Sequence, residues 1–496
     1  MAETAFSGGF DSCINNLHEE IRLLYKADQV PWILGYSGGK DSTATLQLIW
    51  GAISALPVSE RKKTIHVIST DTLVENPVVA AWVSQSLKVM EKAAVEQSMP
   101  IVPHRLTPTV NNSFWVNLIG KGYPAPRHKF RWCTERLKIN PSNTFIKNMI
   151  KLSGEAILVL GTRKAESSRR HANMVKLEEG RIRDRISPNA SLPGSSVYTP
   201  IENWINDDVW FFLNQVDNPW GYNNKDLMGM YAGASADGEC PLVVDTSTPS
   251  CGDSRFGCWV CTLVEKDKSM SAMIQNDAEK EWMLPLLEIR NMIDFRNQAQ
   301  TGDEDRADRD LRDFRRKNGS VQLYFGRVIP GPYLKQYRES FLLAVLKAQE
   351  TIRKTGPRDV TNIELLTIDE LREIRRIWVI EKHELEDTLP GIYKEATGRE
   401  FPFKGIDDSM TIGAAELAIL QIMDGVSEAE YEMTRSLISI ASQQKPGLKK
   451  AKLHDELEKC FKRYQYDSEE EALHNVQELE AERNSVTDEA KEDELE

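Results

Sequence analysis

Long apolar runs are missing from this sequence of 496 residues. No run approaches the roughly 18 apolar residues that a membrane-spanning helix requires. The first residues, MAETAFSGGFDSC, contain neither the basic nor the apolar region of a secretory signal. From these absences we expect a soluble, cytoplasmic protein that has no membrane partner.

A disulfide framework is also missing. The chain has seven cysteines, and an odd number in a cytoplasmic protein does not indicate a disulfide scaffold. Four of the seven fall within 22 residues: Cys240, Cys251, Cys258 and Cys261. This clustering predicts a metal centre.

An excess of basic residues is absent: 75 acidic residues outnumber 62 basic ones, and the formal net charge is −13. Such a balance argues against a nucleic-acid partner. However, residues 466–496 contain 13 acidic and 2 basic residues, which leaves only about −2 for residues 1–465. The body of the protein therefore stays compatible with a polyanion, and the acidic tail is predicted to be partly disordered.

The first half of the chain alternates strand and helix patterns. Strand patterns occur at 31–36, 63–70, 100–106 and 155–162, and helical patterns at 42–53, 77–97 and 135–152, the last with a break at Pro141. This alternation predicts an α/β fold with a doubly wound, mainly parallel sheet. Ligands of such sheets bind beyond the carboxyl ends of the strands. Beyond residue 265 the pattern is almost wholly helical, which predicts a separate α-helical domain.

The stretch GYSGGKDST, residues 35–43, separates the first strand from the first helix of this sheet. Gly38 and Gly39 permit a tight turn that points backbone amides at an anion, and the helix that follows adds its N-terminal positive charge. Ser37 and Ser42 add hydroxyl groups, and Lys40 adds a point charge. We therefore predict a phosphate-binding loop.

This loop is not a P-loop of the GxxxxGK[ST] kind. Only three residues separate Gly35 from Gly39, and Asp41 follows Lys40 where a Ser or Thr would stand. Instead, SGGKDS resembles the PP-loop of the ATP pyrophosphatase superfamily, whose members have an adenine nucleotide alpha hydrolase-like fold. Those enzymes split ATP between the α and β phosphates.

Further stretches resemble the phosphoadenosine phosphosulfate (PAPS) reductase branch of that superfamily over about residues 30–222. These stretches are STDTLVENP, KFRWCTERLK, VLGTRKAESSRR and TPIENWINDDVWFFL. The resemblance implies ATP binding by Ser37, Gly38, Gly39, Lys40, Asp41, Ser42, Asp71, Thr72, Gly161 and Arg163. It also implies catalytic roles for Lys40 and Asp41, with Asp41 as a Mg²⁺ ligand.

The cysteines have the spacing Cys-x10-Cys-x6-Cys-x2-Cys, which suits zinc or an iron–sulfur cluster. Zinc sites often show two Cys-x2-Cys pairs, and the single pair here favours a cluster, with structural zinc as the alternative. Cys133 lies separately in the basic stretch RHKFRWCTERLK at a predicted helix start, where we expect a lowered pKa. It is a candidate catalytic sulfur relay, and a buried structural cysteine is the alternative.

The order of PP-loop domain, cysteine segment and helical extension resembles the DndC family of bacterial DNA phosphorothioation sulfurtransferases. The resemblance implies that Cys240, Cys251, Cys258 and Cys261 hold a 4Fe–4S cluster. It implies ATP-dependent replacement of a non-bridging phosphate oxygen in DNA by sulfur, with a cysteine desulfurase as sulfur donor and other Dnd-system proteins as partners. The basic stretches at 127–138 and 163–185 could contact DNA, the nucleotide or only solvent.

Five parts follow from these patterns: an N-terminal helix at 1–29, a PP-loop domain at 30–235, a cluster-binding segment at 236–265, a helical domain at 266–465 and the acidic tail at 466–496. Three other functions remain open. They are a sulfonucleotide (PAPS or APS) reductase, a tRNA thiolase and a zinc-bearing scaffold of a DNA-modification complex.

Overall fold

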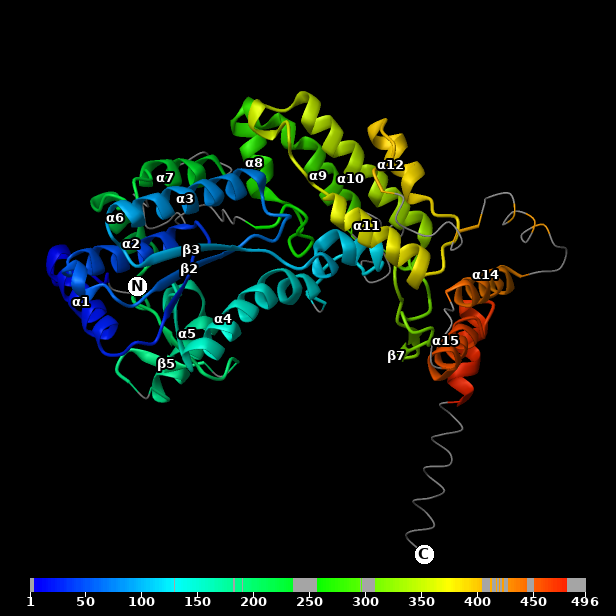
Figure 1. Cartoon of the computed structure of the whole chain (residues 1–496), viewed down its shortest axis with the longest axis horizontal. Coiled ribbons are helices and arrows are strands. Elements are labelled where there is room, and N and C mark those ends of the chain that lie inside the picture. The colour runs from blue at the N-terminus through cyan, green and yellow to red at the C-terminus, as the bar shows by residue number, and fades with distance from the viewer. Residues whose placement is uncertain are drawn as a thin grey trace, which may run out of the picture. The chain divides into compact units, whose positions relative to one another are not determined.

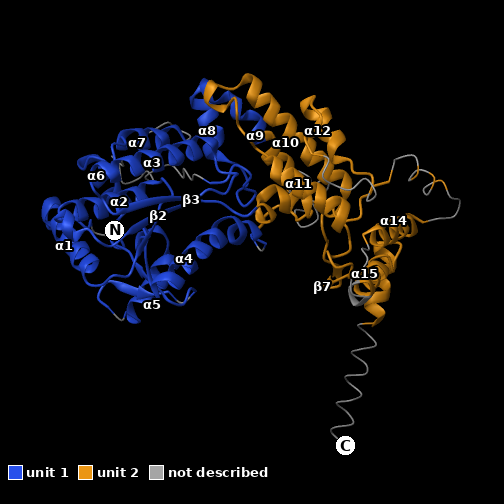
Figure 2. Ribbon diagram, viewed as in Figure 1, with its two compact units in different colours: residues 1–109, 128–287 blue, residues 110–127, 288–496 orange. Residues whose placement is uncertain are grey.

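The computed structural model of the chain describes residues 4–128, 130–181, 183–189, 191–234, 257–294, 296, 308–403, 411–412, 416, 419, 422, 427–443 and 450–479. The chain forms two compact units, shown in Figure 2. Unit 1 contains residues 1–109 and 128–287, and unit 2 contains residues 110–127 and 288–496. The boundaries predicted at 265 and 465 do not coincide with this division.

Unit 1 is built on a six-stranded sheet with the strand order β3-β2-β1-β4-β6-β5. The strands are β1 (Trp32–Gly35), β2 (Ile65–Thr70), β3 (Ile101–Leu106), β4 (Ala156–Val159), β5 (Ile186–Pro188) and β6 (Ser195–Tyr198). All neighbouring strands are parallel except β5, which is antiparallel to β6. The predicted α/β, doubly wound, mainly parallel sheet is confirmed.

Helices cover both faces of this sheet (Figure 1). The helices of unit 1 are α1 (Phe10–Lys26), α2 (Lys40–Ser54), α3 (Pro77–Glu96), α4 (Asn140–Ser153), α5 (Ser168–Glu179), α6 (Asn206–Gln215), α7 (Asn224–Gly233) and α8 (Lys268–Asn276), of which α8 contacts α7. Side chains of β1 alternate between the faces, as a strand requires. Trp32 and Leu34 pack in the cluster with α2 and α3, whereas Ile33 packs in the cluster that contains Ile146 of α4.

The helical pattern predicted at 135–152 changes its winding near the expected break. A π-helix covers Thr134–Ile139, and α4 begins at Asn140, so Pro141 lies in the first turn of an α-helix. Proline is tolerated there because the first amides of a helix have no partner within it.

Unit 2 is mainly helical, as predicted for the C-terminal region. It contains most of α9 (Leu284–Ile293) together with α10 (Lys335–Thr355), α11 (Ile368–Arg376), α12 (Leu389–Thr397), α14 (Glu428–Ser442) and α15 (Lys450–Arg463). Residues 110–127 belong to it, because the indole Nε1 of Trp378 donates a hydrogen bond to the carbonyl of Ile119 at 3.0 Å. A small hairpin joins β7 (Leu323–Tyr324) to β8 (Arg327–Val328).

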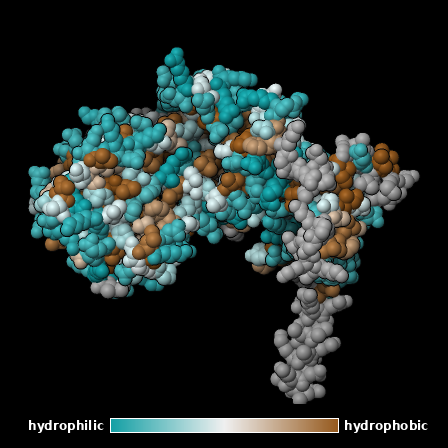
Figure 3. All heavy atoms as spheres, in the orientation of Figure 1, coloured by the Kyte–Doolittle hydropathy of each residue, from teal (hydrophilic) through white to brown (hydrophobic). Residues whose placement is uncertain are grey.

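Part of the acidic tail is ordered: residues 469–479 are helical, and residues 480–496 lie outside the described part. No helix in the described ranges combines the length and apolarity needed to cross a bilayer. On the visible face of unit 1, hydrophobic residues are scattered among hydrophilic ones (Figure 3).

Candidate active site

The predicted phosphate loop lies between β1 and α2, at the point where the strand order reverses. β1 pairs with β2 on one side and β4 on the other, and the chain leaves both β1 and β4 at the carboxyl edge of the sheet. Ligands of open α/β sheets bind in the crevice beside such a switch point. The topology therefore places the loop where a nucleotide is expected.

Glycine is needed at the tightest point of the loop. Gly38 has a φ of 73°, and a Cβ atom there would lie 2.5 Å from Cγ2 of Val83 on α3. The Ser37 and Ser42 hydroxyl oxygens are 3.2 Å apart, and the Ser42 hydroxyl donates to the Gly39 carbonyl at 3.0 Å. These contacts hold the loop against the first turn of α2.

Asp41 lies between two cations. Nε of Arg163 donates to its Oδ1 at 2.6 Å, and Nζ of Lys40 lies 3.3 Å from its Oδ2. The Arg163 side chain is buried and also donates to the Trp204 carbonyl at 3.3 Å. Each carboxylate oxygen of Asp41 thus pairs with one cation. The role of Asp41 as a Mg²⁺ ligand stays a prediction.

Gly161 permits this approach of the segment after β4 to the loop. A Cβ atom at Gly161 would lie 2.7 Å from the backbone oxygen of Asp41 and 2.9 Å from Oγ1 of Thr45. A side chain at position 161 would therefore push the start of α2 away from β4, and it would weaken the contact between Arg163 and Asp41.

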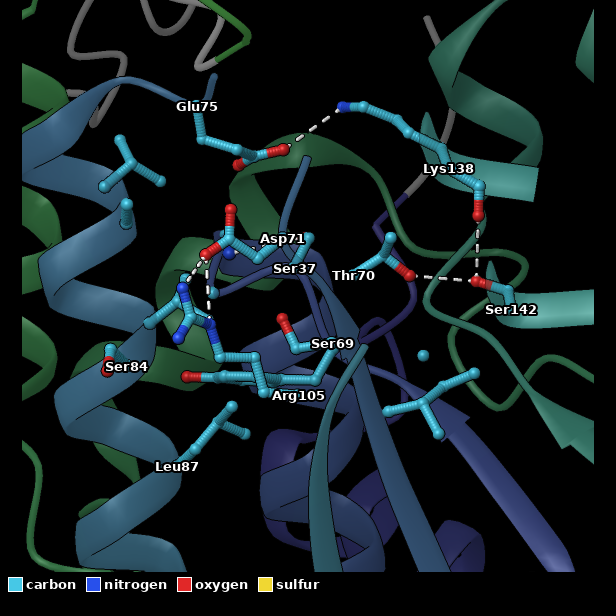
Figure 4. Close-up of a pocket in the computed structure, with 18 of the residues that line it drawn as sticks. Ser37, Ser69, Thr70, Asp71, Glu75, Ser84, Leu87, Arg105, Lys138 and Ser142 are labelled. Carbon is cyan, nitrogen blue, oxygen red and sulfur yellow. Dashed lines mark hydrogen bonds and ion pairs between the residues drawn. The ribbon is translucent and has the colours of Figure 1, made fainter. Parts of the chain in front are cut away.

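A cavity of 600 Å³ opens beside the loop, which is within the range of small-molecule sites. Figure 4 shows its polar wall, built from β2, β3, the β2–α3 loop and the helices that follow. Its charged and hydroxyl lining residues include Ser37, Lys40, Asp71, Glu75, Arg105, Lys138 and Ser142.

Two ion pairs cross this wall (Figure 4). Nε of Arg105 donates to Oδ2 of Asp71 at 3.0 Å, and Lys138 Nζ lies 3.5 Å from Oε1 of Glu75. Burial raises the pKa of Glu75, and Lys138 opposes that rise. Burial also favours the neutral form of Lys138, but the negative charges of Cys258, when ionised, and of Glu75 outweigh burial and raise the pKa of Lys138.

The Cys-x2-Cys turn is fastened to the loop that follows β2. The Asn76 amide donates to the Gly257 carbonyl at 3.2 Å, and the Trp259 amide donates to the Val74 carbonyl at 3.0 Å. The Thr72 hydroxyl lies 3.3 Å from Sγ of Cys258. Backbone pairing thus fixes Cys258 beside the wall of the cavity.

The thiols are neutral in this environment. Burial raises the pKa of Cys258 to about 11, although Lys138 opposes the rise. Burial also raises the pKa of Cys133, and the nearby Cys261 adds to the effect. The predicted lowering of the Cys133 pKa is therefore wrong: the basic residues around it in sequence do not offset its removal from water.

Two of the four predicted cluster ligands lie within the described residues. Cys258 and Cys261 share one turn, in which the Cys261 amide donates to the Cys258 carbonyl at 3.0 Å, and Cys240 and Cys251 lie outside the described residues. This turn suits two thiolate ligands of one metal centre. The described cysteines form no disulfide, and the described residues contain no complete metal-ligand group.

The structure brings part of the predicted nucleotide set together. Ser37, Gly38, Gly39, Lys40 and Asp71 line the cavity, whereas Asp41, Ser42, Gly161 and Arg163 support the loop from outside the cavity lining. Thr72 is buried and directs its hydroxyl to Cys258 instead.

Arg105, Glu75 and Ser142 were missed by sequence reasoning. A signal for Arg105 existed, because residues at the carboxyl ends of adjacent parallel strands must meet, and Arg105 pairs in register with Ser69.

The basic stretch at 127–138 does not act as one surface. Arg127 belongs to unit 2 and pairs with Asp308, Lys138 lines the cavity of unit 1, and Lys129 lies outside the described residues. A DNA contact by the whole stretch remains a prediction.

Comparison with known proteins supports this picture of unit 1. Residues 31–224 match the family model of the phosphoadenosine phosphosulfate reductase domain. An uncharacterized protein of Methanocaldococcus jannaschii is 26% identical over 216 residues. The match covers 44% of this chain and only 38% of that protein's length.

Two solved structures share remote similarity. A PAPS reductase from Candida auris, in a phosphate complex, is 15% identical, with 44% of this chain and 90% of that chain covered and a TM-score of 0.27. An FMN adenylyltransferase from Candida glabrata, in complex with FAD and inorganic pyrophosphate, is 12% identical, with 40% and 55% covered and a TM-score of 0.24. At these TM-scores neither structure adds an argument. The family match, together with the sheet and its loop, identifies residues 31–224 as a PAPS reductase-like domain of the PP-loop superfamily.

Proposed function

We propose that this protein is an ATP pyrophosphatase that activates a DNA backbone phosphate and assists its conversion to a phosphorothioate. The observation that carries the proposal is the fastening of Cys258 to the loop that borders the nucleotide cavity. An activation site and a sulfur-bearing turn then share one wall, as a sulfur-transfer enzyme requires.

The chemistry explains why ATP is consumed. A non-bridging phosphate oxygen is a poor leaving group, so direct displacement by sulfur is slow. When that oxygen attacks the α phosphorus of ATP, pyrophosphate departs and the oxygen becomes the bridge to AMP. The outer sulfur of a persulfide from the desulfurase then attacks the DNA phosphorus, and AMP departs with the original oxygen. A thiol reductant cleaves the remaining S–S bond, which leaves the sulfur on phosphorus and frees the carrier thiol.

The residues of the loop have defined tasks in this proposal. Backbone amides at Gly38 and Gly39, with the N-terminus of α2, bind the departing pyrophosphate. When ATP binds, the Lys40 ammonium group moves from the Asp41 carboxylate to a phosphate oxygen. Arg163 meanwhile keeps Asp41 and the start of α2 in place. These groups neutralise the charge that develops as the bond between the α and β phosphates breaks.

The cysteine turn would hold two of the ligands of an iron–sulfur cluster, with Cys240 and Cys251 proposed as the others. A bound cluster would supply a site for sulfur or electron delivery. Lys138 lies beside Cys258 and would compensate the negative charge of thiolate ligands. A cysteine desulfurase is the proposed sulfur source, and other Dnd-system proteins are the proposed partners.

The match to a domain named for PAPS reductase favours a second candidate, a sulfonucleotide reductase. Such an enzyme would release sulfite from PAPS or APS with a thiol reductant and would need no ATP. Two assays separate the candidates. Phosphorothioate dinucleotides in nuclease digests of DNA treated with ATP, a desulfurase, its sulfur substrate and a thiol reductant support the first. Sulfite release from PAPS or APS, without modified DNA, would refute it.

A further inference from the structure

The hairpin of unit 2 presents two aromatic side chains to solvent at its tip. β7 ends at Tyr324, β8 begins at Arg327, and the turn between them consists of Phe325 and Gly326 (β7 in Figure 1). Tyr324 is 66% exposed and Phe325 is 87% exposed. Their ring centroids are 4.6 Å apart in an edge-to-face arrangement. Exposed aromatic pairs of this size gain nothing from burial in the folded chain.

The backbone conformation of Phe325 is one that phenylalanine rarely adopts. Phe325 has a φ of 48° and Gly326 a φ of 71°, which is the pattern of a two-residue type I′ turn. The first position of that turn favours Asn, Asp or Gly, and a bulky side chain at positive φ is an outlier. Phe325 therefore has a strained backbone conformation and a solvent-exposed side chain, and the folded protein would be more stable with asparagine at this position.

The base of the hairpin is fixed by hydrogen bonds and burial, so the tip projects into solvent in a defined position. The Ile329 amide donates to the Gln322 carbonyl at 2.8 Å and extends the strand pairing. Val328 is buried, and Arg309 donates to its carbonyl at 3.2 Å. A rigid base limits the entropy that a partner must remove when it engages the tip.

Charge around the hairpin has the opposite sign to the charge of the chain. Residues 308–328 contain six basic and three acidic residues, whereas the whole chain has a net charge of −13. Lys317 and Arg327 are exposed and form no ion pair with any described residue.

A polar cavity of 780 Å³ adjoins this surface, and its charged residues include Arg316, Lys317 and Lys459 against Glu381 and Glu456. Arg327 directly follows the turn that carries Phe325, and Lys317 lines this cavity together with Gln322 at the base of the hairpin. Exposed cations near exposed aromatic rings suit a polyanionic partner whose bases can stack.

We infer that this hairpin contacts nucleic acid, with Tyr324 and Phe325 stacking on unpaired or opened bases while Lys317 and Arg327 contact the backbone phosphates. The identification of that nucleic acid as DNA rests on the proposed function. An aromatic side chain at such a tip can also enter a base step and open the duplex. The contact would give unit 2 a role in presenting the backbone that unit 1 activates.

The test compares full-length wild-type protein with Phe325→Asn and Phe325→Trp. Asn suits the turn, so this variant should unfold at the same or a higher temperature while it loses the stacking face. Trp keeps the stacking face. Binding is measured without ATP, by anisotropy of a labelled single DNA strand of about 16 nucleotides that carries 2-aminopurine.

We expect Phe325→Asn to weaken binding by about 5-fold or more and to reduce quenching of 2-aminopurine, because only Tyr324 can still stack, whereas Phe325→Trp binds as wild type. Arg327→Gln should weaken binding and reduce its salt dependence. Wild-type affinity for Phe325→Asn would overturn the inference. Phe325-dependent binding to anionic lipid vesicles in place of DNA would also overturn it. Because the assay contains no ATP, its result is independent of whether the protein forms AMP.

Discussion

Nε of Arg163 donates a hydrogen bond to Oδ1 of Asp41 across 2.6 Å, although the two residues are 122 positions apart in the chain. Asp41 lies in the first turn of α2, just beyond the loop after β1, and Arg163 follows β4. The pair therefore ties together the two strands that flank the switch point of the sheet. It also places a permanent positive charge beside the predicted site of pyrophosphate.

Arg163→Met should reduce the rate of AMP formation by about 10²- to 10³-fold, because a preorganised donor is lost and the Asp41 carboxylate is left with Lys40 alone. The rate is measured with labelled ATP, DNA and a sulfur source, by separating the labelled nucleotides. Arg169→Met is the matched control, because Arg169 lies exposed on the same segment. Equal rates for the two variants would contradict the role given to Arg163.

Gly161→Ala tests the close approach of β4 to the loop. The added methyl group meets the backbone oxygen of Asp41 at 2.7 Å, and backbone cannot move aside as a flexible side chain can. We expect a loss of about 1–3 kcal/mol in the free energy of unfolding, together with a loss of AMP formation.

Gly229→Ala serves as the control for Gly161→Ala. A Cβ atom at Gly229, in helix α7, meets nothing within 4 Å, so alanine should be neutral or stabilising there. Thermal unfolding of both variants provides the comparison. Unchanged stability of Gly161→Ala would show that the loop and β4 are less tightly packed than the structure indicates.

The parts of the site that were predictable from sequence are those encoded locally. The run of apolar residues 32–34 and the glycines at 38 and 39 specify a strand followed by an anion-binding turn, and both are present. Contacts between distant segments were not predictable. No local pattern indicates that the Arg163 side chain pairs with the Asp41 carboxylate.

The pKa of Cys133 also could not be predicted from its sequence neighbours. Its sequence neighbours are basic, which favours a thiolate, but the pKa depends more on burial, which sequence shows only indirectly. The position of Arg105 at the end of a predicted strand was a signal, but its pairing with Asp71 depends on which strands are neighbours, and the sequence does not state that order.

Cys258→Ser should remove most of the iron and sulfide from anaerobically purified protein, because it deletes one proposed cluster ligand on the turn. The absorbance near 400 nm, roughly where sulfur-to-iron charge transfer occurs, should fall with it. Cys13→Ser, on helix α1, is the control and should retain both. A colourless wild-type protein with one equivalent of zinc would contradict the cluster.

Lys382 in unit 2 should make stability depend on pH. It lines a cavity of 380 Å³, where burial, with help from Arg338 and Arg463, lowers its pKa from 10.5 to about 7 against the opposing effect of Glu384 and Asp313. Between those pH values the unfolded chain binds the proton and the folded chain does not, so stability rises with pH.

Lys382→Met removes this effect. Relative to the variant, the wild-type protein should therefore gain stability between about pH 7 and about pH 10, and the variant should be the more stable protein at the lower pH. Urea unfolding at several pH values measures the difference. A difference that does not change with pH would show that Lys382 keeps an ordinary pKa.

The central claim is that the loop after β1 directs cleavage of ATP between the α and β phosphates. Wild-type protein is incubated with ATP labelled at the α or the γ phosphate, together with DNA and a sulfur source, and the labelled products are separated. The account predicts labelled AMP from the first substrate and labelled pyrophosphate from the second, with neither product from Lys40→Ala. Labelled ADP and inorganic phosphate, or AMP formation that survives Lys40→Ala, would contradict it.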